Sequence, residues 1–164
     1  LPVVTIARVQ GAAFGGGVGL VSCCDIAVAA PEASFCLSEV KIGLIPATIS
    51  PYVINAIGER AARRYFTTAE VISADKALEL GLVSERVDSA EQLDEAVEQI
   101  LKSVLRNGPD AMAAAKSLVL DYANRQIDDA LIADSSRRIA ETRVSSEGQE
   151  GLTAFLEKRR PDWR

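Results

Sequence analysis

Short β-branched runs separated by glycine and proline dominate the first half of the chain. Residues 3–9 form one such run and end at Gly11, a pattern typical of a buried strand that leaves into a turn. Apolar residues then cluster over residues 17–24, which favours a short helix, and residues 26–30 return to a strand pattern. The pattern predicts a strand, a turn, a helix and a second strand in that order.

A further short strand and a structured loop are expected next. Residues 35–37 have the strand pattern, and the loop over residues 39–46 is punctuated by Gly43 and Pro46. Glu39 therefore stands where a strand gives way to a loop. Functional groups concentrate at such positions.

From residue 51 onward the apolar positions follow a mostly helical spacing. Helices are predicted over residues 52–57, 60–67 and 73–80. Ser73 is placed to cap the last of them and Gly81 to end it, since serine favours the N-cap and glycine the position after the last turn. A strand over residues 82–87 should follow.

The second half is predicted to be entirely helical. Residues 89–92, Ser-Ala-Glu-Gln, form a capping-box pattern that opens an amphipathic helix ending near residues 107–109. Three more helices are expected over residues 110–122, 127–143 and 146–158. The chain thus divides into an α/β part over residues 1–87 and a helical part over residues 88–164.

Composition narrows the class of protein. With 48% apolar and 25% charged residues in 164, the chain should fold around a core. A net charge of -5 and the lack of a basic run argue against nucleic acid as a partner. No apolar run approaches the roughly 20 residues that span a bilayer, and no charged leader is visible, so a soluble, cytoplasmic protein without a membrane partner is expected.

Histidine is absent, which removes Ser-His-Asp triads, Cys-His dyads and the commonest metal ligand. Cys23 and Cys24 are adjacent and Cys36 stands alone, so they lack the spacing of a zinc site and are expected to be small buried thiols. No metal site is predicted. Acid–base chemistry must come from carboxylates, lysines, tyrosines or cysteines.

A glycine-rich turn over residues 11–19 is the main candidate for chemistry, because such turns present backbone amides to an anion. The Walker pattern fails because Gly16 is followed by Gly17-Val18, and the dinucleotide pattern from Gly15 fails at Leu20. An oxyanion hole for a thioester fits better. Taken alone, the glycines could equally serve tight packing of a strand on a helix.

Seven short motifs, in this order along the chain, resemble the crotonase (enoyl-CoA hydratase/isomerase) superfamily. They are residues 12–17, 24–26, 38–40, 43–46, 72–74, 81–83 and 155–159. Four segments look more closely like bacterial methylglutaconyl-CoA hydratases and their isohexenylglutaconyl-CoA relatives, namely residues 17–21, 44–47, 49–54 and 147–151.

The resemblance implies an α/β fold, the C-terminal part of a ββα spiral, followed by a helical region that packs homotrimers or hexamers. The few strands and the early entry into a sheet agree with an expectation that the chain is part of something longer. An acyl-CoA substrate is implied, with coenzyme A as part of the substrate and no separate cofactor.

The resemblance also implies site residues. The amide of Gly16 would hold the thioester oxygen, and Glu39 would be the working carboxylate, while a second donor would come from an earlier loop without a counterpart here. Gly19 stands where two-carboxylate hydratases carry their first glutamate, and so is expected to leave room for a branched acyl chain. Gly15, Pro46 and Ala47 would also line the substrate site.

Two residues of the motif over residues 155–159, Phe155 and Lys158, match the family's C-terminal contact with coenzyme A, although a solvated lysine is about as good an explanation for Lys158. A single glutamate suits hydration of an enoyl thioester and also proton transfer between carbons. Three functions therefore remain open at this point: a hydratase, an isomerase or other crotonase chemistry, and a non-catalytic acyl-CoA-binding or oligomer-forming module.

Overall fold

The computed structural model describes all 164 residues, which fall into two compact units. One unit comprises residues 5–100 and the other comprises residues 1–4 with residues 101–164. The strands are β1 (Ile6–Val9), β2 (Ala12–Phe14), β3 (Ile26–Ala29), β4 (Ser34–Cys36), β5 (Ile72–Ser73) and β6 (Glu85–Arg86). The α-helices are α1 (Gly16–Cys23), α2 (Ser50–Thr68), α3 (Ala74–Glu79), α4 (Leu93–Val104), α5 (Pro109–Tyr122), α6 (Asp129–Val144) and α7 (Ser146–Leu156).

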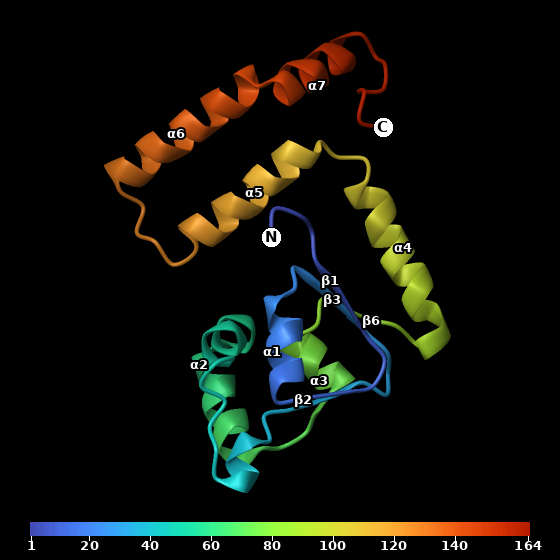
Figure 1. Ribbon diagram of the computed structural model, residues 1–164, viewed down its shortest axis with the longest axis vertical. Helices are drawn as coiled ribbons and strands as arrows, with labels where there is room; N and C mark the ends of the chain where they lie inside the picture. The colour runs from blue at the N-terminus through green and yellow to red at the C-terminus, as the bar shows by residue number, and fades with distance from the viewer. The chain divides into compact units, whose positions relative to one another are not determined.

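Two small sheets form the framework of the α/β unit (Figure 1). The first has the order β1-β3-β6 and is parallel throughout, with Ile6 opposite Ile26 and Val28 opposite Glu85. In the second, β4 pairs in parallel with β2 and antiparallel with β5. Parallel strands need cover on both faces, and the continuous apolar sequence of β3 suits that burial.

The core of this unit lies where α1, α2 and α3 pack against the strands. Its most deeply buried side chains include Val18 of α1, Phe35 of β4, Val53 of α2 and Ile72 of β5. A smaller apolar cluster gathers Val28, Ala30, Val87 and Leu93 at the start of α4. The low aromatic content is consistent with a core built mainly from aliphatic faces.

Helix α2 is bent at Gly58, whose φ of 77° and ψ of 158° are not helical. The sequence predicted separate helices over residues 52–57 and 60–67, and the bend lies between them. Gly81, with φ 81°, follows α3 as predicted, and the hydroxyl of Ser73 caps that helix by accepting from the amide of Lys76 at 3.2 Å.

Four sequence expectations differ from the structure. The cysteines were predicted to be buried, but only Cys36 is; Cys23 is exposed and Cys24 half-buried, because both lie at the end of α1. Residues 12–14, taken as part of the turn, form β2 instead. The strand predicted over residues 82–87 shrinks to β6, because the amides of Leu82 and Val83 bond to the carbonyl of Ala77 at the end of α3. The capping box is also wrong: Ser89 makes no cap hydrogen bond, and Gln92 accepts from the amide of Asp88 at 3.0 Å.

The helical unit depends on a side-chain cap that comes from a distant helix. The carboxylate of Glu147, on α7, accepts from the amides of Asp110 (2.9 Å) and Ala111 (2.8 Å) in the first turn of α5. A Cβ on Gly108 would stand 2.3 Å from the Oε1 atom of Glu147. Glycine is therefore required at position 108 if the carboxylate is to reach α5.

Asp134 on α6 is the centre of a polar network between α5 and α6. It accepts from the hydroxyl of Tyr122 at 2.7 Å and pairs with Arg137 and with Arg138, the latter at 2.8 Å. Arg138 also pairs with Asp121 at 2.7 Å. The hydroxyl of Tyr122, followed by the guanidinium of Arg137, holds the pKa of Asp134 well below its ordinary value, at about 2.

We expect Asp134→Asn to weaken the helical unit at neutral pH and to change little at pH 2. A carboxylate whose pKa is lowered in the folded state stabilises that state above the unfolded pKa, about 3.9, and loses this contribution as pH falls toward 2. Urea unfolding of both proteins at several pH values measures the difference. Glu98→Gln, at an exposed position of α4, is the control, and a gap between wild type and Asp134→Asn that stays constant down to pH 2 would contradict the assignment.

Candidate active site

The glycine turn is held at the junction of β2 and α1. Gly15, the N-cap of α1, has φ 51° and ψ -118°, a conformation that a side chain strongly disfavours. Its amide donates to the carbonyl of Cys36, at the end of β4, at 2.8 Å. This hydrogen bond ties the beginning of the helix to the second sheet.

Two amides at the beginning of α1 have no acceptor in the protein. Those of Val18 and Gly19 bond back to the carbonyl of Gly15, whereas those of Gly16 and Gly17 donate to no protein atom. The first amides of a helix lack intrahelical partners, and the helix dipole makes this end favourable for negative charge. With the amide of Gly15 already bonded, Gly16 and Gly17 are the available donors.

Glu39 brings a carboxylate to this turn. It begins a 3-10 helix, Glu39–Ile42, which ends at Gly43 with φ 76°, and its carbonyl accepts from the amide of Leu44 at 3.0 Å. Its Oε1 atom lies 3.2 Å from the position that a Cβ on Gly15 would take, and its Oε2 atom is buried without a hydrogen-bond partner. The structure thus brings together Gly15, Gly16 and Glu39, which the sequence singled out separately.

The volume beside Gly19 is filled by Ile49. A Cβ on Gly19, which is buried in α1, would stand 2.2 Å from the Cγ2 atom of Ile49. The room that the sequence suggested for a branched acyl chain is therefore occupied in this structure. Glu39 therefore lies beside the N-cap of α1, and Ile49 packs against a residue within the helix.

Pro46 and Ala47 follow the 3-10 helix. Pro46 is buried and Ala47 is exposed; the carbonyl of Ala47 accepts from the hydroxyl of Ser50 at 2.8 Å, while its amide has no acceptor in the protein. Neither residue forms a hydrogen bond with Gly15, Gly16 or Glu39. Their part in a substrate site stays a prediction.

Phe155 and Lys158 belong to the helical unit. The side chain of Phe155 is 79% exposed at the end of α7, and Lys158, just beyond, has φ 54° and makes no ion pair. The amide of Lys158 donates to the carbonyl of Phe155 at 3.3 Å. An apolar and a cationic side chain thus stand close together in sequence, and both are accessible.

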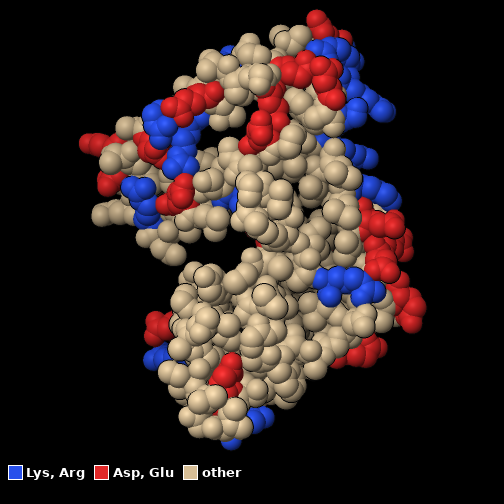
Figure 2. Space-filling model, in the orientation of Figure 1, with Lys and Arg blue, Asp and Glu red and all other residues tan.

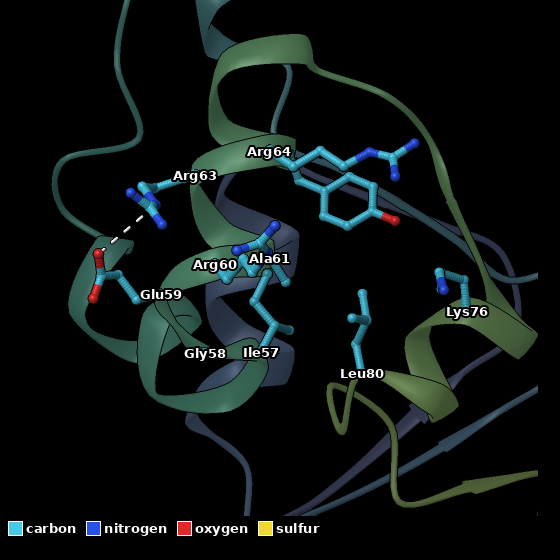
Figure 3. Close-up of a pocket in the computed structure, with 10 residues that line it drawn as sticks. Ile57, Gly58, Glu59, Arg60, Ala61, Arg63, Arg64, Lys76 and Leu80 are labelled. Atoms are coloured by element: carbon cyan, nitrogen blue, oxygen red, sulfur yellow. Dashed lines mark ion pairs between the residues drawn. The ribbon is translucent and has the colours of Figure 1, made fainter.

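A hollow of about 870 Å³ lies along α2 and α3 and shares no residue with the glycine turn or Glu39. In Figure 3 Arg63 turns toward Glu59 on one side, whereas Arg64 and Lys76 lie on the other, with Ile57 and Leu80 between. Three of its four cations are paired, Arg63 with Glu59 (3.7 Å), Arg64 with Glu70 (2.6 Å) and Lys76 with Glu79 (2.6 Å), while Arg60 forms no ion pair. This pairing reduces the attraction of the hollow for an anion.

Sequence reasoning missed three contributors to the site: Gly17 as a second amide donor, Cys36 as the acceptor that fixes Gly15, and Ile49 as the apolar neighbour of Gly19. Gly17 could have been found, since every helix leaves its first amides unpaired. The other two contacts join segments 21 and 30 residues apart and leave no signal in the local pattern.

No group of three or more cysteine, aspartate or glutamate side chains in the structure is arranged to hold a metal ion. None of its helices combines the length and apolar character needed to cross a membrane.

Comparison with known proteins gives one consistent result. An enoyl-CoA hydratase from Shewanella pealeana is 54% identical with a TM-score of 0.94, and Pseudomonas aeruginosa AtuE is 40% identical with a TM-score of 0.92; the chain is covered to 99% in both and spans 60% and 62% of those structures. The enoyl-CoA hydratase AKT6-1 of Alternaria alternata is 38% identical over 161 residues, and the chain spans 53% of its length.

The chain therefore corresponds to little more than half of these relatives and keeps their crotonase-like α/β fold. The family model described as enoyl-CoA hydratase/isomerase matches residues 1–164. The chain belongs to the enoyl-CoA hydratase/isomerase family.

Proposed function

We propose that this chain supplies the glycine-turn amides and the Glu39 carboxylate of an enoyl-CoA hydratase. One observation carries the proposal: the carboxylate of Glu39 lies against Gly15, beside the unpaired amide of Gly16. Family membership supports crotonase chemistry in general. Hydration as the specific reaction, and an enoyl-CoA as its substrate, are our proposal.

The unpaired amide and the carboxylate of Glu39 suit two different requirements of the reaction, stabilising negative charge and accepting a proton. As water adds to an enoyl thioester, negative charge develops on the thioester oxygen, and an amide at a helix N-terminus stabilises that charge. A carboxylate oxygen without a partner is free to accept a proton. The Oε2 atom of Glu39 is such an oxygen.

Glu39 would handle both protons. It takes a proton from water while the water oxygen bonds to the β-carbon and the carbon–carbon π electrons move toward the thioester oxygen. The protonated Glu39 then returns its proton to the α-carbon. The sum is addition of one water molecule, and Glu39 regains its charge.

The alternative is an enoyl-CoA isomerase. Gly19 carries no side chain and Ile49 fills the volume beside it, so no second carboxylate lies there. A site with one carboxylate favours the isomerase. One glutamate that removes a proton from one carbon and returns it to another would move a double bond without adding water.

Several finer features are part of the same proposal. The substrate is an enoyl-CoA, with methylglutaconyl-CoA or a related branched glutaconyl-CoA as the candidate that the sequence motifs suggest. Phe155 and Lys158 would contact coenzyme A, the first through its apolar ring and the second through its charge. The protein would work as a homotrimer or hexamer.

Glu39→Gln should lower turnover about 10²- to 10⁴-fold, because the amide keeps the shape of the side chain and cannot accept the proton. The measurement is product formation from crotonyl-CoA and methylglutaconyl-CoA in ¹⁸O-labelled water. A hydratase gives a labelled hydroxyl group, whereas an isomerase gives an unlabelled product with a shifted double bond. Glu32→Gln, at an exposed turn position, is the control; equal activity of the two variants would refute the role of Glu39.

Gly16→Pro should lower turnover about 10²- to 10³-fold, because proline removes the amide hydrogen and its fixed φ suits the first helical position. Gly16→Ala keeps that hydrogen, and a Cβ there meets nothing within 4 Å, so its turnover should stay close to wild type. Circular dichroism checks that both variants fold. A similar loss in both would show that shape at position 16 matters rather than the amide.

Gly19→Ala should destabilise the protein by about 1–3 kcal/mol, because the new methyl group meets Ile49. Combining it with Ile49→Ala should restore about 1 kcal/mol relative to the sum of the single changes. Gly17→Ala is the matched control, since its Cβ would meet that of Ala13 at an ordinary 3.5 Å. Urea unfolding measures the free energy of unfolding of Gly19→Ala, Ile49→Ala, their combination and Gly17→Ala. If the losses of the two single variants simply add in the combination, Ile49 does not fill the space beside Gly19.

A further inference from the structure

An arginine-lined hollow lies in the helical unit. Its volume is about 420 Å³, and it is lined by Leu105, Arg106, Arg160 and Arg164. The first two residues follow the end of α4, and the other two belong to the segment after α7. In Figure 2 lysine and arginine atoms gather along the edge where Figure 1 places the C-terminus.

The charges around this hollow are not neutralised by the protein. The guanidinium groups of Arg106 and Arg160 form no hydrogen bond and no ion pair. Arg164 donates from its Nε atom to the carbonyl of Arg106 at 2.7 Å, which fixes the side chain and leaves its charge unpaired. Guanidinium groups remain charged across the accessible pH range.

A neighbouring arginine explains why no acid reaches the hollow. Arg159 pairs with Glu150 at 2.6 Å, with Glu157 at 2.7 Å and with Asp162 at 3.8 Å. The first two of these contacts raise the pKa of Arg159. All three carboxylates thus go to one guanidinium, and the other arginines of this segment receive none.

The hollow along α2 and α3 offers a comparison within the same chain. It too is lined by basic side chains, but three of its four cations, Arg63, Arg64 and Lys76, have a carboxylate within 4 Å, and Arg60 alone forms no ion pair. An anion entering there competes with existing ion pairs. An anion entering the arginine-lined hollow competes with none, although the net charge of the chain is -5.

We propose that the hollow lined by Arg106, Arg160 and Arg164 binds a phosphate group. The planar fork of a guanidinium donates two parallel hydrogen bonds to phosphate oxygens, and the terminal oxygens of a phosphate can accept from several forks at once. A dianion also matches several unpaired positive charges better than a single carboxylate does. The hollow shares no residue with the site proposed for hydration and does not depend on the proposed reaction.

The test is calorimetric titration of the purified protein with inorganic phosphate, with sodium chloride keeping the ionic strength constant. Wild type should bind phosphate saturably, and the double variant Arg106→Gln/Arg160→Gln should raise the Kd about tenfold or more. The double variant Arg106→Lys/Arg160→Lys, which keeps the charges and loses the forks, should fall between them. Arg60→Gln, in the hollow along α2 and α3, removes one charge elsewhere and should leave the Kd within about twofold of wild type.

Titrations with coenzyme A and with its analogue lacking the 3′-phosphate identify the source of the phosphate. If the Gln variant weakens binding of coenzyme A and not of the analogue, the phosphate is that of coenzyme A; if it affects neither, the ligand is free phosphate or another phosphate ester. Absence of saturable phosphate binding in wild type would overturn the proposal. So would an equal loss in Arg60→Gln and in the Arg106/Arg160 variant.

Discussion

The hydrogen bond from the amide of Gly15 to the carbonyl of Cys36 is the constraint on which the candidate site depends. It joins the beginning of α1 to the end of β4 while Gly15 takes a conformation that a side chain disfavours. Because the amide of Gly15 is used in this bond, the next amides are the ones exposed to a ligand. Because Gly15 has no Cβ, the carboxylate of Glu39 can lie where its Oε1 atom would be only 3.2 Å from such a Cβ.

The parts of this arrangement that the sequence predicts are local. A run of glycines before an apolar segment indicates a turn into a helix, and Gly43 and Pro46 mark the loop that begins at Glu39. Helices α5, α6 and α7 were expected close to their observed bounds, because their ends carry strong signals such as the Asp128 cap of α6. In each case neighbouring residues determine the outcome.

The parts that the sequence does not predict depend on contacts between distant segments. Strand β2 exists because residues 12–14 find a partner in β4, although they read as turn by themselves. Ser89 has the right neighbours for a capping box, yet it makes no cap bond. The cap of α5 comes from Glu147, 37 residues away, and local propensity carries no trace of it.

Gly15, the N-cap of α1, and Gly19, within the helix, are each approached by a side chain from another segment. Because neither glycine has a side chain, the carboxylate of Glu39 can lie beside the first and the side chain of Ile49 can pack against the second. Ile49 brings no charge to Gly19, so Glu39 supplies the one carboxylate next to these two glycines. The carboxylate that we propose for proton transfer therefore lies at the end of α1 that carries the unpaired amides, where negative charge is also best stabilised.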